Sequence, residues 1–256
     1  MARSISSSRR AVREMERGTA VDDAEAFVHC NVILIAVPDD QLCTAINRLA
    51  VADFDYASKT ALQVSGARDA SDLARLEKRG ASAGSMLPLQ SFGRRPSSLA
   101  GVAFLLEGNP KALRVARILV RAWGGEASAV TAAEKKRAAI AASIATDVLT
   151  AVLHDAARRL RDVGLSRGRA VESLGTLAKT SLEDVSRAGR KARPGPALRG
   201  ETETVRRLMA ADPKGGPIGY REALQFAREI MPESNERNSI DSILSPTDAL
   251  AAGAGR

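Results

Sequence analysis

Five basic residues surround a short proline- and glycine-containing turn in the second half of the chain, where they could hold an anion. They flank the stretch Pro194-Gly195-Pro196, and they are Arg187, Arg190, Lys191, Arg193 and Arg199. An arginine can hold a carboxylate or phosphate through two parallel hydrogen bonds, so Arg199 is a candidate for binding the anionic group of a substrate. The alternative is a solvated turn between helices, whose shape the two prolines fix.

A second group of polar side chains follows an apolar stretch. Six of the seven residues of Asn31–Val37 are apolar and several are β-branched, which predicts a strand buried on both faces of a parallel sheet. Pro38 ends this strand, and Asp39 and Asp40 place carboxylates in the first turn of a following helix. Ligands of open α/β sheets bind at the carboxyl ends of strands, so this turn is a candidate ligand site. A core strand followed by an ordinary turn is the alternative.

The composition argues against several classes of protein. Cys30, Cys43, His29 and His154 form no metal-ligand pattern, so we expect neither a zinc site nor a disulfide framework, as in a reducing cytoplasm. Aromatic residues make up 3% of the chain and the net charge of +8 is spread among acids, so nucleic acid is not the expected partner. No apolar run reaches about 18 residues, so we expect no membrane span.

Strands alternate with helices in the first half of the predicted structure. We expect strands at 31–37, 60–66, 81–86, 101–107 and 126–130, and helices at 5–17, 40–50, 69–79 and 110–123. This alternation predicts an α/β fold with a doubly wound parallel sheet.

The pattern changes at about Thr131, after which only helices are expected. The segment 132–163 reads as one long alanine-rich helix, and shorter helices follow at 166–189, 200–211 and 217–230. Their apolar faces need partners, which predicts a helical bundle or a homodimer. We therefore expect a sheet domain at 1–130, a helical, dimerising domain at 131–231, and a disordered tail at 232–256.

Four stretches resemble a known group of proteins. They are Ile33-Leu-Ile-Ala-Val-Pro-Asp-Asp40, Gly84-Ser-Met-Leu-Pro-Leu-Gln-Ser-Phe92, Phe104-Leu-Leu-Glu-Gly108 and Gly195-Pro-Ala-Leu-Arg-Gly-Glu201. Over residues 2–231 the chain resembles Rossmann-like bacterial proteins with a C-terminal helical domain of unknown function. These belong with the 6-phosphogluconate dehydrogenase-like, ketopantoate reductase-like and pyrroline-carboxylate reductase-like oxidoreductases. The second and fourth stretches are the more specific.

The resemblance implies a nicotinamide cofactor, NADP, over the carboxyl ends of the strands. Ala36, Val37 and Pro38 would lie against the cofactor, and Arg3 with Ser4 would bind its 2′-phosphate. Without the resemblance, Arg3 is simply an arginine in a flexible terminus.

The same resemblance suggests residues for the substrate. Gln90 of the second stretch and Arg199 of the fourth would bind it. On the long helix, Lys135 and Asp147 would be the polar residues near the reaction. The alternative for this pair is an ordinary lysine in a first turn and a helix aspartate with a local partner.

Three features depart from the pattern of the group. The chain has no Gly-x-Gly-x-x-Gly motif and no strand before it, so we expect a Rossmann-like sheet that is truncated at the N-terminus. Two explanations remain open: the sequence begins at an internal start of a longer protein, or the gene copy has decayed. Leu87 stands where the group tends to have histidine. Ala139 stands four residues after Lys135, where histidine or asparagine is usual.

Two functions remain open at this stage. The first is an NADP-dependent oxidoreductase that transfers hydride to or from a small keto, hydroxy or imino acid-like substrate in a cleft between its domains. The second is a nucleotide-binding or regulatory protein that keeps the fold without turnover.

Overall fold

The computed structural model describes residues 1–2, 4–93, 97–212, 219–231 and 233–245 of the chain. The chain divides into two compact units, Met1–Thr146 and Asp147–Arg256.

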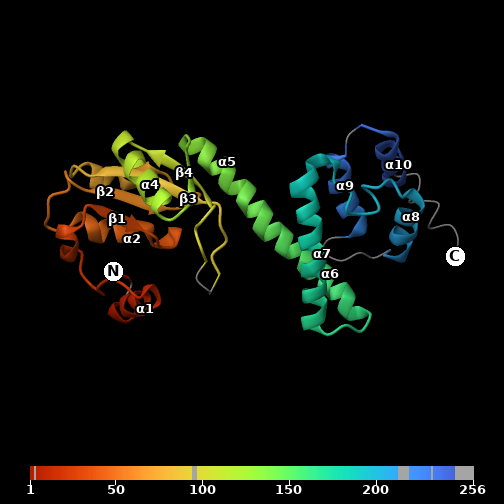
Figure 1. Cartoon of the computed structure of the whole chain (residues 1–256), viewed down its shortest axis with the longest axis horizontal. Coiled ribbons are helices and arrows are strands. Elements are labelled where there is room, and N and C mark those ends of the chain that lie inside the picture. The colour runs from red at the N-terminus through yellow and green to blue at the C-terminus, as the bar shows by residue number, and fades with distance from the viewer. Residues whose placement is uncertain (3, 94–96, 213–218, 232, 246–256) are drawn as a thin grey trace. The chain divides into compact units, whose positions relative to one another are not determined.

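The first unit contains a five-stranded sheet in which the strands lie side by side in the order of the sequence (Figure 1). They are β1 (Val32–Ile35), β2 (Thr60–Val64), β3 (Ser82–Pro88), β4 (Ala103–Gly108) and β5 (Glu126–Ala129). The five strands correspond one to one to those predicted. The α/β class is confirmed.

The prediction of an entirely parallel sheet was wrong for one strand pair. The pairs β1–β2, β2–β3 and β4–β5 are parallel, but β3–β4 is antiparallel, with Gly84 opposite Gly108. Parallel neighbours are usually joined by a crossover helix. The described residues between β3 and β4 contain no helix, and the Leu89 N–H donates to the Ala103 carbonyl, so the chain returns directly beside the strand it has left.

The prediction that the strand at 31–37 is buried on both faces was also wrong. Ile33 and Ile35 are buried, but the side chain of Leu34 on the other face is 44% exposed. β1 lies at the edge of the sheet and pairs only with β2 among the described strands, so this face has less cover than a central strand would have.

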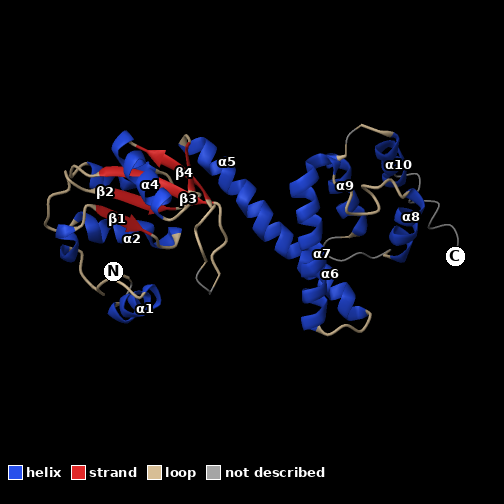
Figure 2. Cartoon of the chain, viewed as in Figure 1, coloured by secondary structure: helices blue, strands red, loops and turns tan. Residues whose placement is uncertain are grey.

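Helices cover both faces of the sheet (Figure 2). Ala61 and Ala83 pack into one apolar cluster with Leu42 of α2, whereas Leu62 and Met86 pack into the other. Alternate residues of a strand point to opposite faces, which accounts for the two clusters. The helices of this unit are α1 (Ile5–Met15), η1 (Glu25–His29), α2 (Asp39–Ala50), η2 (Ala70–Leu73), α3 (Ala74–Glu77), α4 (Pro110–Ala122) and α5 (Ala132–Ser143).

The described residues of the second unit form helices without strands. These helices are α6 (Leu149–Asp162), α7 (Arg167–Ala188), η4 (Gly189–Lys191), α8 (Thr202–Ala211), α9 (Tyr220–Ile230) and α10 (Asn235–Leu244). One π-helical segment, Ile144–Val148, interrupts the predicted helix 132–163 without ending it. The expected tail at 232–256 contains α10, because Ile240 and Ile243 are buried in a cluster with Leu224.

By length and composition alone, one described helical run, Ala132–Asp162, is long and apolar enough to cross a membrane. Only 6% of its most apolar window is buried. The expectation of no membrane span therefore stays a prediction.

Candidate functional site

Three polar side chains form a row across the centre of the sheet. Gln63 of β2 lies opposite Ser85 of β3, and Ser85 lies opposite Glu107 of β4, so all three project from the same face. Gln63 and Ser85 are buried. A polar row in otherwise apolar central strands requires partners, because a buried polar group without a hydrogen bond is costly.

Lys135 of α5 supplies the charge that this row surrounds. Its Nζ donates to the carbonyl oxygens of Ser65 (3.2 Å) and Arg68 (2.6 Å) and to Ser85 Oγ, and it lies 3.5 Å from Glu107 Oε2. The side chain is fully buried. Burial lowers the pKa of this ammonium below its usual value, and the Glu107 carboxylate opposes that shift. The lysine thus joins α5 to three neighbouring strand ends.

The same contacts fix the turn that follows β2. Glu107 accepts from the Ala70 N–H through both oxygens at 3.1 Å, and Gln63 Nε2 donates to the Asp69 carbonyl at 2.6 Å. Ser65 Oγ donates to Asp39 Oδ2 at 3.0 Å, which ties the turn to the first residue of α2. Gln63 Oε1 is buried without a hydrogen-bond partner in the described part of the chain. The result is a rigid polar framework at the carboxyl edge of β2.

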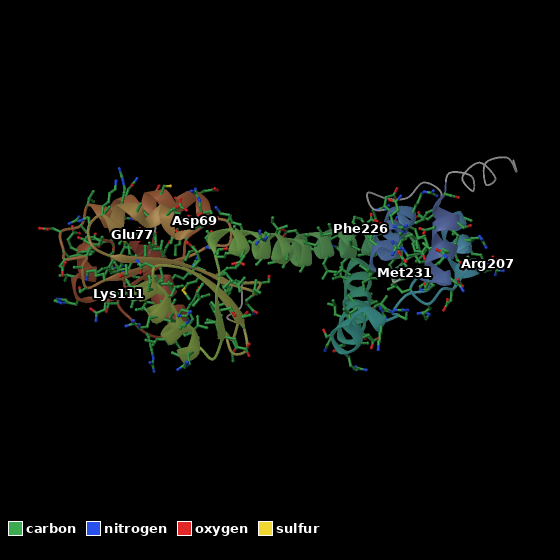
Figure 3. All side chains as sticks on the ribbon, turned by 90° about the horizontal axis from the view of Figure 1, so that it is seen from above. Asp69, Glu77, Lys111, Arg207, Phe226 and Met231 are labelled. Atoms are coloured by element: carbon green, nitrogen blue, oxygen red, sulfur yellow. The ribbon has the colours of Figure 1, made fainter. Side chains whose placement is uncertain are left out.

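Asp69 in this turn lies beside α5 (Figure 3) and forms a partly exposed ion pair with it. Lys136 Nζ lies 2.7 Å from Asp69 Oδ2, and this contact, with hydrogen bonds from Ser71, lowers the pKa of the carboxyl to about 2. The Lys136 ammonium correspondingly has its pKa raised.

We expect this pair to stabilise the fold above about pH 4 and to lose its contribution on acidification. The folded pKa of Asp69, about 2, lies below its usual value of 3.8, so the unfolded chain binds the proton first as the pH falls. The contribution is lost between about pH 4 and pH 2. Urea unfolding of wild type and Lys136→Met at neutral pH and in this acid range measures it. A difference between the two proteins that does not shrink on acidification would contradict the assignment.

The two predicted catalytic residues have different surroundings. Lys135 is enclosed in the first unit, as described, whereas Asp147 is exposed in the π-helical segment at the start of the second unit. Their roles stay a prediction.

The two apolar departures from the family pattern lie against the same residue. A Cβ added to Gly66 would lie 2.9 Å from Ala139 Cβ and 3.3 Å from Leu87 Cδ1. Leu87 is half-buried at the end of β3, and Ala139 is half-buried on α5. The two positions where the resemblance predicts groups able to transfer protons therefore carry apolar side chains, and both lie close to Gly66.

The residues proposed for the cofactor lie in two places. Ala36, Val37 and Pro38 link β1 to α2, and Ala36 and Pro38 are exposed. Ser4 is the N-cap of α1, where its Oγ accepts from the Ser7 N–H at 3.2 Å. Arg3 lies outside the described residues.

The residues proposed for the substrate are also separate. Gln90 is half-buried two residues after β3. Arg199, in the second unit, donates from Nε to Glu201 Oε1 at 2.6 Å and from Nη1 to the Pro194 carbonyl at 3.1 Å. This pairing keeps the pKa of the Glu201 carboxyl below its usual value. A substrate anion would have to compete with Glu201 for the guanidinium.

Sequence reasoning missed Gln63, Ser85 and Glu107 as partners of Lys135. Each interrupts an apolar stretch within its strand, and this was the available signal. Their alignment depends on the strand register, including the antiparallel β3–β4 pair, which the sequence pattern did not predict.

Comparison with known proteins identifies the fold. Residues 102–225 match the family model described as a domain of unknown function (DUF2520). No curated protein matches the sequence.

Several solved structures are similar over most of their length. A protein from Thermotoga maritima has 20% identity and a TM-score of 0.65, with 90% of this chain and 88% of that one covered. An oxidoreductase of Bacteroides fragilis, provisionally named as NADP-dependent, has 15% identity and a TM-score of 0.63, with 90% of this chain and 86% of that one covered. A reductive aminase from Aspergillus terreus, solved with NADPH4, cyclohexanone and allyl amine, has 17% identity and a TM-score of 0.59, with 92% of this chain and 88% of that one covered. The chain therefore has a Rossmann-like fold followed by a helical region, and its residues 102–225 match the DUF2520 model.

Proposed function

We propose that this protein is an NADP-dependent oxidoreductase that acts on a small keto, hydroxy or imino acid-like substrate. The observation that carries the proposal is the breadth of the structural match: a reductase solved with NADPH4 resembles 92% of the chain, sheet and helical region together. The buried lysine framework at the carboxyl edge of β2 adds support, because ligands of such sheets bind at this edge.

The described residues fit part of a nicotinamide dinucleotide. Ala36 and Pro38 after β1 are exposed, so a ligand could lie against this turn. Arg3, which lies outside the described residues, would pair with a 2′-phosphate. The amino end of α2 does not fit a pyrophosphate, because Asp39 and Asp40 place carboxylates in its first turn. When bound, the cofactor supplies a hydride. Gln90 and Arg199 would orient the substrate, and Lys135 and Asp147 would be the polar groups available to hold a proton.

Thermal unfolding with and without NADPH and NADH tests the proposal. A ligand at about a hundred times its dissociation constant adds roughly 2.7 kcal/mol to the free energy of unfolding, which raises Tm by several degrees. We expect NADPH to raise Tm more than NADH does, and Arg3→Ala to remove the difference. Equal Tm values with and without NADPH would overturn the proposal.

A second candidate is a nucleotide-binding protein without turnover, and the contact of Leu87 and Ala139 around Gly66 favours it. The same thermal unfolding experiment separates the two candidates when it is combined with a screen for NADPH oxidation in the presence of keto and imino acids. Stabilisation by NADPH together with turnover supports the enzyme. Stabilisation without turnover, unchanged in Asp147→Ala, supports the second candidate.

We also propose that the protein forms a homodimer through its helical unit in the cytoplasm. Large apolar side chains are exposed on α6 and α7, including Leu177 (63%) and Leu182 (52%), and a groove of about 700 Å³ lies between these helices. Both cysteines are free and exposed, as is typical of a reducing compartment. Leu177→Glu with Leu182→Glu should convert a dimer to a monomer in sedimentation velocity, whereas Val163→Glu, an exposed control at 73%, should not.

A further inference from the structure

The outer face of α4 carries four cations and no acid. Lys111, Arg114, Arg117 and Arg121 recur at intervals of three or four residues, which places them on one side of the helix, and all four are exposed. Ile118 lies among them with 63% of its side chain exposed. The three arginines and Ile118 line a shallow groove of about 730 Å³. We call this surface the α4 cationic face.

Several other arginines on the described surface form ion pairs, which the cations of this face do not. Arginines of α6, α8 and α9, such as Arg158, Arg207 and Arg228, pair with carboxylates at 2.6–3.7 Å. None of the four cations of α4 forms an ion pair within the described part of the chain. Like charges three or four residues apart on a helix destabilise it, so this arrangement opposes folding unless an external anion compensates it.

An unpaired acidic patch lies in the same unit. It consists of Asp22, Asp23, Glu25, Asp53 and Asp55, and all five are exposed without an ion pair among the described residues. Its two segments pack together, because Ala24 and Phe27 share an apolar cluster with Phe54. Val51 beside it is 80% exposed.

Two arginines lie beside this patch and offset part of its charge without forming an ion pair with it among the described residues. Arg48 donates to the Asp22 carbonyl, and Arg79 donates to the carbonyls of Ala50 and Ala52, so both arginines bind backbone oxygens. The Glu77 carboxylate accepts from Asn109, at the start of α4.

The acidic patch and the α4 cationic face adjoin each other. Lys111 Nζ donates to the Ala57 carbonyl at 3.1 Å, two residues beyond Asp55. Lys111 and Glu77 are found at the same end of this unit (Figure 3). Opposite charges side by side on one surface are self-complementary about a two-fold axis, because each copy offers both halves of the contact.

We propose that a second copy of this chain covers both surfaces. The α4 cationic face of one copy lies on the acidic patch of the other, and the reverse, with Ile118 and Val51 as the apolar centres of the contact. Arginine with an exposed aliphatic residue is typical of a protein interface, whereas a nucleic acid partner would gain nothing from Ile118. This contact is separate from the proposed α6–α7 interface, which is apolar.

Charge reversal with mixing tests this proposal on the full chain. One variant carries Arg114→Glu and Arg117→Glu, and the other carries Asp22→Lys and Asp53→Lys. Arg206→Glu with Arg207→Glu is the control for the first variant, since it makes the same change in net charge on exposed residues of α8. Sedimentation velocity at about 0.05 M and about 0.5 M salt measures association, because screening is much stronger at the higher concentration.

We expect wild type and the control to show an association step at low salt that weakens at high salt. For each charge-reversed variant alone, the dissociation constant of this step should rise at least about tenfold, since like charges then face each other. An equimolar mixture of the two variants should regain it. In the mixed dimer the reversed α4 face of one variant lies on the reversed patch of the other, and the two native surfaces lie on each other, so both contacts are attractive. Three results would overturn the proposal: no salt-sensitive step in wild type, loss of the step in the control, or a mixture that stays as dissociated as its components.

Discussion

Replacement of Lys135 by methionine is expected to lower the free energy of unfolding by about 3–5 kcal/mol. The change removes the ammonium that Glu107 faces at 3.5 Å and leaves that carboxylate with the Ala70 N–H as its remaining partner. It also leaves the carbonyls of Ser65 and Arg68 without the donor they share. Removing one member of a buried pair is far more costly than removing an exposed one. Urea unfolding at neutral pH measures the effect.

Lys136→Met is the matched control for this prediction. Lys136 is the next residue of the same helix turn, and its side chain is half exposed in its pair with Asp69. Its replacement should change stability much less, because water screens an exposed pair. Equal losses of unfolding free energy in the two variants would show that the buried contacts of Lys135 add no more stability than the exposed pair of Lys136 does. A double variant Lys135→Met, Glu107→Leu should regain part of the loss, since both charges are then absent.

The sequence was sufficient for the elements and for the candidate lysine, but not for the surroundings of that lysine. The strand at 101–107 was predicted from its apolar residues, and Glu107 within it was given no role. Its role follows from the β3–β4 register, in which Glu107 lies opposite Ser85. Antiparallel pairing of these strands depends on the path of the intervening chain. Apolar periodicity does not encode that path.

The exposure of Leu34 has a similar explanation. The apolar run predicted the strand at 31–37, and it was interpreted as a central strand buried on both faces. Whether a strand is central depends on which neighbours pair with it, and β1 has one described neighbour. The helical unit was easier to predict, since α7, α8 and α9 begin and end within a few residues of the expected bounds. The expected helix 132–163 is α5 and α6 joined by the π-helical segment, and α6 ends one residue before the expected end. Local signals such as Gly164 and the Ser166 cap are sufficient there.

Replacement of Gly108 by alanine is expected to cost about 2–4 kcal/mol, because this glycine meets two constraints at once. Its φ is +139°, a conformation that side chains rarely adopt. A Cβ at this position would lie 2.5 Å from the Ala83 carbonyl oxygen and from Gly84 Cα, both of them backbone atoms that cannot rotate away. The clash would separate β4 from β3 at the point where Glu107 reaches Lys135, so the polar framework should loosen together with the sheet.

Gly101→Ala separates the two causes. Gly101 has a φ of +73° but no atom within 4 Å of an added Cβ, so its replacement carries the conformational cost alone, about 1–2 kcal/mol. A larger loss in Gly108→Ala than in Gly101→Ala, measured by urea unfolding, assigns the difference to the close approach of β3 and β4. Hydrogen exchange should then show faster exchange of the Asn109 N–H, which donates to the Ala83 carbonyl across that contact. Similar losses and unchanged exchange would mean that the strands shift apart at little cost, and the antiparallel pairing would then not be what holds Glu107 against Lys135.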